Sequence, residues 1–479
     1  MVTVMLDAKT CFQARTSRDS RFDGKFFTAV LTTGIFCRPI CPARAAKEEN
    51  VRYFENSQQA LESGFKPCKR CLPEHAPEQM YPVVLKRMAD ALVTSQESVA
   101  QIASYFELSE RQFRRNFSDA FGIAPTQYRL HHHSLLARKL IQNTTLTMTE
   151  VCFAAGFTSL RQFNQTIKQT FSCTPSQLRK SKGKEQKSSG IDIKLHYRPP
   201  FDWQAMLSFF QHRQLQGVEV VTNESYQRTI NVGQHKGWFK VTHLPSGHAL
   251  NLHVVLDDYK HLNYIINKVR RLFDLDADMN LIHQQLSTDP VLASSIEKNK
   301  GVRLPGCWDL FEFSVRAILG QQVSVKAATT LAARIASRYG DSNTFSNTDL
   351  TLLFPTVEQL SDASFEDLGL TQARIQTLRT WVEYYQNNAE TLTHYQDLSV
   401  LEKQLVALKG IGPWTVNYIA MRGLSDPNAF PASDLGIIKA LTKEDKKPTT
   451  KQIIERASAW QPWRAYATLY LWLSNAKKS

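Results

Sequence analysis

Residues 406–418 read VALKGIGPWTVNY. An apolar segment leads into a Gly-x-Gly turn, and Pro413 can open a second helix because its fixed φ suits the first helical turn. Gly410 and Gly412 permit a tight hairpin, and the backbone N–H groups at the start of the second helix can hold a phosphate. The stretch predicts two helices joined by a hairpin, although an isolated Gly-x-Gly hairpin is more often an ordinary helix connection.

Three neighbouring segments give this hairpin a context. FPASDLG (430–436) places Asp434 just beyond the second helix, and RLPGCWDLFEFSVRAILGQQVSV (303–325) and WQPWRAYATLYLW (460–472) flank it on either side. Together they resemble the helix-hairpin-helix glycosylases with a Gly/Pro-rich loop and an aspartate. The closest resemblance is to the bacterial 3-methyladenine DNA glycosylase II (AlkA) family, over nearly all of residues 191–479.

The resemblance implies a role for individual residues of this half. Asp434 matches the catalytic carboxylate, Trp414, Tyr418 and Trp472 match aromatic residues of the base pocket, and the hairpin glycines match DNA-phosphate contacts. Taken alone, Asp434 is better explained as a surface or helix-capping acid, and its neighbours reverse that preference. Gln322 stands where the family carries a leucine wedge, so weaker DNA distortion is expected.

The implied chemistry is coherent. Alkylation at a purine ring nitrogen makes the base cationic and weakens the glycosidic bond, so the enzyme must flip the nucleotide and stabilise an oxocarbenium-like sugar with one carboxylate. The faces of Trp414 and Trp472 suit a cationic base through cation–π attraction. Relatives that also cut the backbone carry a lysine where Trp414 stands, so base removal without lyase chemistry is expected. The sequence also lacks the trailing cysteine cluster of iron–sulfur relatives, so no iron–sulfur cluster is expected. No organic cofactor is expected either.

At the start of this half, alternating segments predict an antiparallel sheet over about 191–260, with a helical pattern from Tyr264 onward. The segments are 218–221, 226–230, 237–241 and 249–254. The stretch KSKGKEQKSSG, which ends at Gly190, is small and charged, which predicts a flexible linker over 181–190.

Residues 80–180 show no two-residue alternation and are predicted to be helical. Two helix-turn-helix patterns occur about 50 residues apart, with Ser109 and Ser159 as helix caps and phenylalanines at core spacing. Either pattern alone is typical of a solvated amphipathic helix. The pair, each followed by a similar segment (GIAPTQYR and CTPSQLRK), resembles the AraC-type DNA-binding domain. Side chains on the outer faces suit base reading in the major groove: Arg111, Arg114, Arg161, Gln162 and Asn164.

Four of the eight cysteines fall within 35 residues, in the segments CRPIC and CKRC. Cys37, Cys41, Cys68 and Cys71 form a Cys-x3-Cys and a Cys-x2-Cys pair, which can bring four thiolates to one tetrahedral Zn²⁺ ion. A purely structural zinc site is the usual reading of such spacing. Basic side chains flank both pairs, however, and would attract a DNA phosphate to a nucleophilic sulfur: Arg38, Arg44, Lys66, Lys69 and Arg70.

The zinc segment, about residues 5–76, resembles the amino-terminal domain of the bacterial Ada adaptive-response proteins, through SRFDGKF (20–26), TTGIFCRPICPAR (32–44) and GFKPCKRC (64–71). That resemblance implies irreversible transfer of a methyl group from a DNA methylphosphotriester to zinc-bound Cys37. Ada proteins also carry an AraC-type domain at the next position. Their Pro-Cys-His-Arg motif for guanine-methyl repair is absent here.

Composition agrees with a DNA-binding protein. The chain has 479 residues, 58 Lys and Arg against 44 Asp and Glu, and a net charge of +14, which favours a polyanionic partner. No long uncharged apolar stretch or secretory signal is present, so a cytoplasmic, nucleoid-associated protein without membrane contact is expected. The expected partner is double-stranded DNA, both alkylated and promoter sites, with RNA polymerase as a further candidate and a monomeric state.

The predicted fold class is a multidomain α+β chain. It comprises a zinc methyl-acceptor domain (1–78), an all-α double helix-turn-helix domain (79–180), the linker (181–190), an antiparallel β subdomain (191–285) and a helix-hairpin-helix glycosylase domain (286–479). The favoured function combines methyl transfer, transcription regulation and excision of 3-methyladenine-type bases. The alternative is a transcription regulator with structural zinc and an inactive, DNA-clamping glycosylase-like half. Oxidised-base or mismatch excision is a further enzymatic alternative, against which the missing lysine and cysteine cluster count.

Overall fold

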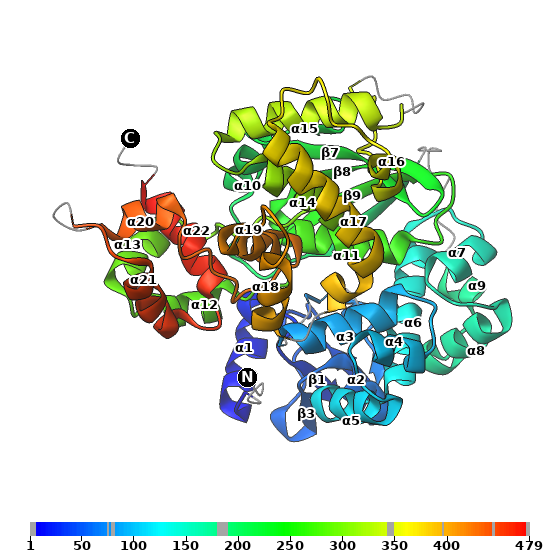
Figure 1. Ribbon diagram of the computed structural model, residues 1–479. Helices are drawn as coiled ribbons and strands as arrows, with labels where there is room; N and C mark the ends of the chain where they lie inside the picture. Colours follow the sequence, from blue (N-terminus) through cyan, green and yellow to red (C-terminus); the bar gives the residue numbers. More distant parts are fainter. Residues whose placement is uncertain are drawn as a thin grey trace. The chain divides into compact units, whose positions relative to one another are not determined.

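The computed structural model describes residues 6–73, 76–77, 82–179, 190–342, 349–394, 397–442 and 446–475. The chain forms two compact units (Figure 1). The N-terminal unit comprises Met1–Pro199, His243–Arg270 and Leu275–Ala277, and the C-terminal unit comprises Pro200–Thr242, Arg271–Asp274 and Asp278–Ser479. The predicted multidomain α+β class is confirmed. The predicted linker lies outside the described residues except for Gly190.

A small four-stranded sheet opens the N-terminal unit. Strand β1 (Phe27–Val30) pairs antiparallel with β2 (Ile35–Cys37) and β3 (Val51–Phe54), and β4 (Lys66–Pro67) runs parallel to β2, giving the order β3-β1-β2-β4. Two helices, α1 (Ala8–Ser17) and α2 (Ser57–Glu62), accompany the sheet, as do two short 3₁₀ turns, Ser20–Phe22 and Glu48–Asn50. The sheet and α2 pack around buried Phe27, Phe36 and Phe65. The parallel pairing of β2 with β4 places Cys37 and Cys68 at the same end of neighbouring strands.

The predicted helical region follows. Its helices are α3 (Val83–Thr94), α4 (Val99–Tyr105), α5 (Glu110–Phe121), α6 (Pro125–Asn143), α7 (Met148–Ala154), α8 (Leu160–Phe171) and α9 (Pro175–Leu178). Ser109 and Ser159 cap α5 and α8 through their side chains, as predicted. Phe113, Phe117 and Phe163 are fully buried. The amphipathic pattern of the two helix-turn-helix segments therefore correctly predicted which side chains form the core.

The long helix α6 carries a buried histidine. The His133 side chain is 2% exposed, its Nε2 lies 3.3 Å from the Val93 carbonyl oxygen, and its ring packs on Phe157 with the centroids 5.6 Å apart. A Cβ at residue 156 would lie 2.6 Å from this ring, and Gly156 has a φ of +95°, so glycine is required there. Burial lowers the pKa of His133 to about 4.

Lowering the pH from 7 to 5 is therefore expected to cost about 2 kcal/mol of stability through His133. Its folded-state pKa of about 4 lies below the ordinary 6.5. The contribution of the neutral ring is complete above pH 6.5 and is lost as the pH falls toward 4. Urea unfolding of the wild type and His133→Gln at both pH values measures this, and the variant should lose about 2 kcal/mol less. An equal loss in both proteins would contradict the assignment.

Strands and helices after the linker match the predicted β region. β5 (Ile191–His196) pairs antiparallel with β9 (Ala249–Leu256) in the N-terminal unit. In the C-terminal unit, β6 (Glu219–Val221), β7 (Ser225–Val232) and β8 (His235–Leu244) form an antiparallel meander. The sequence did not predict helix α10 (Trp203–Gln211), whose buried face packs beside β6 and β7. Helix α11 (Leu262–Leu272) begins close to the predicted change of pattern.

Helices build the rest of the C-terminal unit (Figure 1). They are α12 (Met279–Leu286), α13 (Pro290–Lys298), α14 (Leu310–Leu319), α15 (Val325–Tyr339), α16 (Val357–Ser361), α17 (Gln372–His394), α18 (Leu398–Val406), α19 (Pro413–Tyr418), α20 (Leu435–Leu441), α21 (Thr450–Ala457) and α22 (Arg464–Asn475). A π-helical turn, Ile419–Gly423, continues α19. Helix α22 packs against α13 and α20. Among the described helices, none is long and apolar enough to span a membrane.

Candidate functional sites

The structure brings the four clustered cysteines together. The sulfur atoms of Cys37, Cys41, Cys68 and Cys71 all lie within 4.8 Å of one another. Four thiolates around a tetrahedral Zn²⁺ with bonds of about 2.3 Å would be about 3.8 Å apart, so the cluster fits one zinc ion. Cys68 and Cys71 are buried, whereas Cys37 and Cys41 are half-buried. The ion would therefore be reached by solvent, or by DNA, from the side of Cys37 and Cys41.

The four sulfurs differ in their hydrogen bonds. Cys71 Sγ accepts the backbone N–H of Arg38 and Cys68 Sγ accepts that of Arg70, each at 3.3 Å. The hydrogen bonds to the two buried sulfurs leave the half-buried pair, Cys37 and Cys41, as candidates for the more nucleophilic sulfur. Hydrogen bonds to a thiolate reduce its nucleophilicity because they stabilise the charged ground state.

The basic rim differs in part from expectation. The side chains of Arg44 and Arg70 are exposed, as a DNA-facing role requires. Arg38, by contrast, is 5% exposed and forms an ion pair with the equally buried Asp23. Its Nη1 also donates to the Cys71 carbonyl oxygen at 3.2 Å. Arg38 therefore holds the second cysteine pair in place and does not present its charge at the surface.

The zinc segment is also attached to helix α6. Arg138 is fully buried and donates from Nη2 to the Cys68 carbonyl oxygen at 3.1 Å. On the same helix, His132 Nε2 lies 3.0 Å from Gln58 Nε2 of α2. Helix α6 contacts α3, α5, α7, α8 and α9 as well. A change at the cysteines can thus reach the central helix of the helix-turn-helix region through direct contacts.

The predicted base-reading side chains lie on the outer faces of α5 and α8. Arg111, Arg161, Gln162 and Asn164 are exposed. Arg114 forms an ion pair with Glu110 at 2.6 Å, and both side chains are partly exposed to solvent. A DNA phosphate could therefore take the place of Glu110 as the partner of Arg114. These positions are compatible with major-groove contacts.

The predicted hairpin forms between α18 and α19. Gly410 has a φ of +89°, and a Cβ there would lie 2.0 Å from Thr377 Oγ1, so only glycine fits. Gly412 is the N-cap of α19 and has open space around it. A neighbouring loop is fastened to the hairpin, because Gln321 Nε2 donates to the Gly410 carbonyl oxygen at 3.0 Å and to Thr415 Oγ1 at 2.9 Å. Gln322, which stands at the position of the family's wedge residue, comes directly after Gln321. Its side chain is exposed, and its φ is +56°.

Asp434 lines a cavity of about 270 Å³ in the C-terminal unit, together with Trp414, Tyr418 and Trp472. Asp434 Oδ1 accepts the backbone N–H groups of Gly436 (2.8 Å) and Ile437 (3.2 Å) and so caps α20. The same atom accepts Trp472 Nε1–H at 2.8 Å, and Oδ2 accepts Trp414 Nε1–H at 2.9 Å. The carboxylate is therefore fixed in orientation at the cavity wall.

The aromatic side chains of the cavity are arranged around Tyr418. Its ring stacks on Trp414, with centroids 5.1 Å apart and an interplanar angle of 14°, and Trp472 lies 6.4 Å away at 59°. Arg422 Nη1 donates to the Tyr418 hydroxyl oxygen at 2.9 Å. The three predicted pocket aromatics and the predicted carboxylate thus lie in one place, although they come from α19, α22 and the start of α20.

Comparison with known families agrees with this geometry. Four family models match: "Metal binding domain of Ada" (10–74), "Helix-turn-helix domain" (102–181), "AlkA N-terminal domain" (192–309) and "HhH-GPD superfamily base excision DNA repair protein" (315–464). A Mycobacterium tuberculosis protein described as "Probable bifunctional transcriptional activator/DNA repair enzyme AlkA" is 36% identical, over 97% of this chain and 96% of its own length. The chain belongs to this Ada–AlkA fusion family.

Other relatives of the Ada–AlkA fusion chain match one part of it. The "DNA-3-methyladenine glycosylase 2" of Escherichia coli is 34% identical and covers 58% of this chain and 95% of its own length. The solved structure of a 3-methyladenine DNA glycosylase from Archaeoglobus fulgidus shares the fold, with a TM-score of 0.53, 22% identity and coverage of 60% of this chain and 99% of its own.

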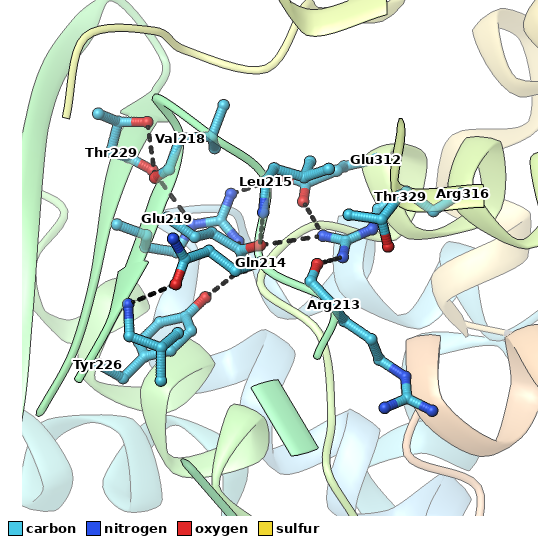
Figure 2. A network of polar contacts seen from close by, with 12 residues as sticks. Arg213, Gln214, Leu215, Val218, Glu219, Tyr226, Thr229, Glu312, Arg316 and Thr329 are labelled. Carbon is cyan, nitrogen blue, oxygen red and sulfur yellow. Dashed lines mark hydrogen bonds and ion pairs between the residues drawn. The ribbon is translucent and has the colours of Figure 1, made fainter. Parts of the chain in front are cut away.

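The Ada–AlkA structure also shows pocket residues that sequence reasoning missed. Arg213, Arg422 and Cys307 line the cavity. A buried network beside them includes Glu219, Glu312 and Arg316 (Figure 2), which form ion pairs with one another or with Arg228. In the network Arg228 pairs with Glu312 at 2.6 Å and Arg316 pairs with Glu312 at 3.0 Å. In the sequence these charged residues are single positions in separate segments, such as Glu312 and Arg316 in the apolar segment LFEFSVRAIL, and such positions do not indicate a pocket.

Proposed function

We propose that this protein repairs alkylated DNA by two separate chemistries and regulates transcription in response. Cys37 accepts a methyl group from a DNA methylphosphotriester, and the Asp434 cavity excises alkylated bases of the 3-methyladenine type without cutting the backbone. The observation that carries the proposal is the Asp434 carboxylate fixed at the wall of an aromatic cavity. Release of free base from methylated DNA by the full chain tests it.

In the methyl transfer, Cys37 is the nucleophile. A Zn²⁺ ion held by the four cysteines keeps their sulfurs deprotonated at neutral pH. The Cys37 thiolate attacks the methyl carbon, an S–C bond forms, the C–O bond breaks, and the phosphodiester leaves with the electron pair. The half-buried position of Cys37 and the backbone N–H bonds to the sulfurs of Cys68 and Cys71 support this choice.

In base excision, Asp434 stabilises positive charge on the sugar. The nucleotide must leave the base stack to reach the cavity, which costs a few kcal/mol. As the glycosidic bond breaks, its electron pair leaves with the base, and the carboxylate faces the developing oxocarbenium ion. Water then adds to the sugar carbon and loses a proton. Trp414 occupies the hairpin position of a lyase lysine, so the proposed reaction stops at the abasic site.

Regulation would follow from the charge change at Cys37. Methylation converts a thiolate into a neutral thioether and so removes one negative charge from the face that meets DNA, which should tighten DNA binding. The contacts of Arg138 and His132 support communication between the zinc segment and α6. The proposed partner is double-stranded DNA, at both damaged and promoter sites. RNA polymerase is a second proposed partner, and we propose that the protein acts as a monomer.

The residue roles in the glycosylase half predict the effect of Trp472→Phe. The substitution keeps an aromatic ring but removes the Nε1–H bond to Asp434 Oδ1. Loss of one bond to a charged group should slow single-turnover base release roughly tenfold. Trp460→Phe is the matched control, because Trp460 Nε1 donates to Asp289 Oδ2 at 3.1 Å outside the cavity. Equal rates for the two variants would contradict the positioning role of Trp472.

A further inference from the structure

The Tyr418 end of the cavity carries two guanidinium groups. Arg422 Nη1 donates to the Tyr418 hydroxyl oxygen at 2.9 Å, and Arg213 interacts with the same hydroxyl. Burial opposes ionisation of this phenol, but the two arginines outweigh it, and the pKa of Tyr418 is lowered. The pocket, for which the sequence predicted three aromatic residues and one carboxylate, therefore also has cationic hydrogen-bond donors beside one of its rings.

The two arginines differ in how they are bound. Arg422 donates to Tyr418 and also, from Nε and Nη2, to the carbonyl oxygens of Pro305 (2.9 Å) and Gly306 (3.1 Å). Its guanidinium is held by the protein on three sides. Arg213 donates from Nη1 to the Phe209 carbonyl oxygen at 3.1 Å and interacts with Tyr418. A guanidinium has five N–H donors, more than these two contacts use, and Arg213 lines the cavity.

Arg213 is also fixed in place. Its guanidinium lies over the Phe209 ring, 3.8 Å from the centroid. Its backbone carbonyl accepts a hydrogen bond from Arg316 Nη2, and the following residues are held by Glu219 Oε2, which accepts Leu215 N–H at 3.1 Å (Figure 2). Burial lowers the pKa of Arg213 to about 10, so it remains a cation at neutral pH. A fixed donor can discriminate between ligands more sharply than a mobile one.

We propose that Arg213 is a specificity-determining residue that donates a hydrogen bond to a carbonyl oxygen of the flipped base. A guanidinium only donates, so it favours a keto group and disfavours an amino group at the same position. Of two purines methylated at the same ring nitrogen, the guanine-type base gains from Arg213 and the adenine-type base does not. The inference rests on the proposed base excision and adds a residue that selects among the bases.

The test uses the full chain and duplex DNA treated with a methylating agent. Released 3-methylguanine and 3-methyladenine are quantified from the same single-turnover reaction, so their rate ratio is independent of enzyme concentration. Arg213→Met keeps an unbranched apolar side chain beside Phe209 but removes the donors. We expect the 3-methylguanine to 3-methyladenine ratio to fall roughly tenfold, because release of 3-methylguanine slows more than release of 3-methyladenine.

Two further variants complete the test. Arg213→Lys keeps a cationic donor and should restore part of the ratio, and Arg334→Met, outside the cavity, should leave it unchanged. An unchanged ratio in Arg213→Met, or an equal fall in release of both bases, would overturn the proposal. If the wild type released neither base, the proposed excision itself would fail, which is a distinguishable result.

Discussion

Asp434→Asn is expected to abolish base release while leaving the fold intact. The amide oxygen can still accept the Gly436 and Ile437 N–H groups that cap α20, so the local structure should persist. The negative charge that stabilises the oxocarbenium-like sugar is lost, and charge stabilisation of this kind contributes about 10²–10³ or more to the rate. Single-turnover release of 3-methyladenine from methylated duplex DNA measures the effect.

The matched control for this prediction is Asp278→Asn. Asp278 caps α12 in the same manner, accepting Leu281 N–H at 3.3 Å, but does not line the cavity. It should cost some stability and leave base release close to wild type. Substantial release by Asp434→Asn, with the fold verified by circular dichroism, would remove Asp434 from the mechanism.

Cys37→Ser is the second substitution with a large expected effect, the complete loss of methyl transfer. A serine hydroxyl is a poor nucleophile at neutral pH and a poor zinc ligand, so no methyl group should reach residue 37. Transfer of labelled methyl from methylphosphotriester DNA, followed by peptide mass analysis, locates the acceptor.

Cys173→Ser controls for thiol loss outside the zinc cluster, because Cys173 is half-buried and lies in the helical region. It should transfer the methyl group as the wild type does. Because Cys37→Ser also weakens zinc binding, the location of the label in the wild type is the sharper result. Label on Cys41 instead of Cys37 would contradict the assignment, and label on Cys68 or Cys71 would also contradict the hydrogen-bonding argument.

Much of the site was predictable because short motifs carry strong geometric requirements. Gly410 adopts a φ of +89° and Pro413 begins α19, so the hairpin forms where the sequence predicts it, and the position of Asp434 after it follows from chain order. The two cysteine pairs reach one ion because β2 and β4 pair in parallel. Asp434 proved to be a helix cap as well as a cavity residue, so the simpler reading of this acid was true but incomplete.

The remainder depended on contacts between distant segments, which periodicity does not encode. The sequence predicted Arg38 to be a surface residue beside a cysteine. Instead, Arg38 is buried because it pairs with Asp23, which lies 15 residues earlier in the chain. Arg213 reaches Tyr418 across about 200 residues of sequence. Charged residues are usually exposed, so a buried arginine becomes evident only when its carboxylate or carbonyl partners are placed around it.

The most direct test of the account uses duplex DNA methylated with a labelled methyl group, incubated with the purified full chain. The wild type should place label both on the protein and in free base. Cys37→Ser should yield labelled free base only, and Asp434→Asn labelled protein only. Loss of both products in either single variant, or free-base release that survives Asp434→Asn, would contradict the claim that one chain carries two independent repair sites.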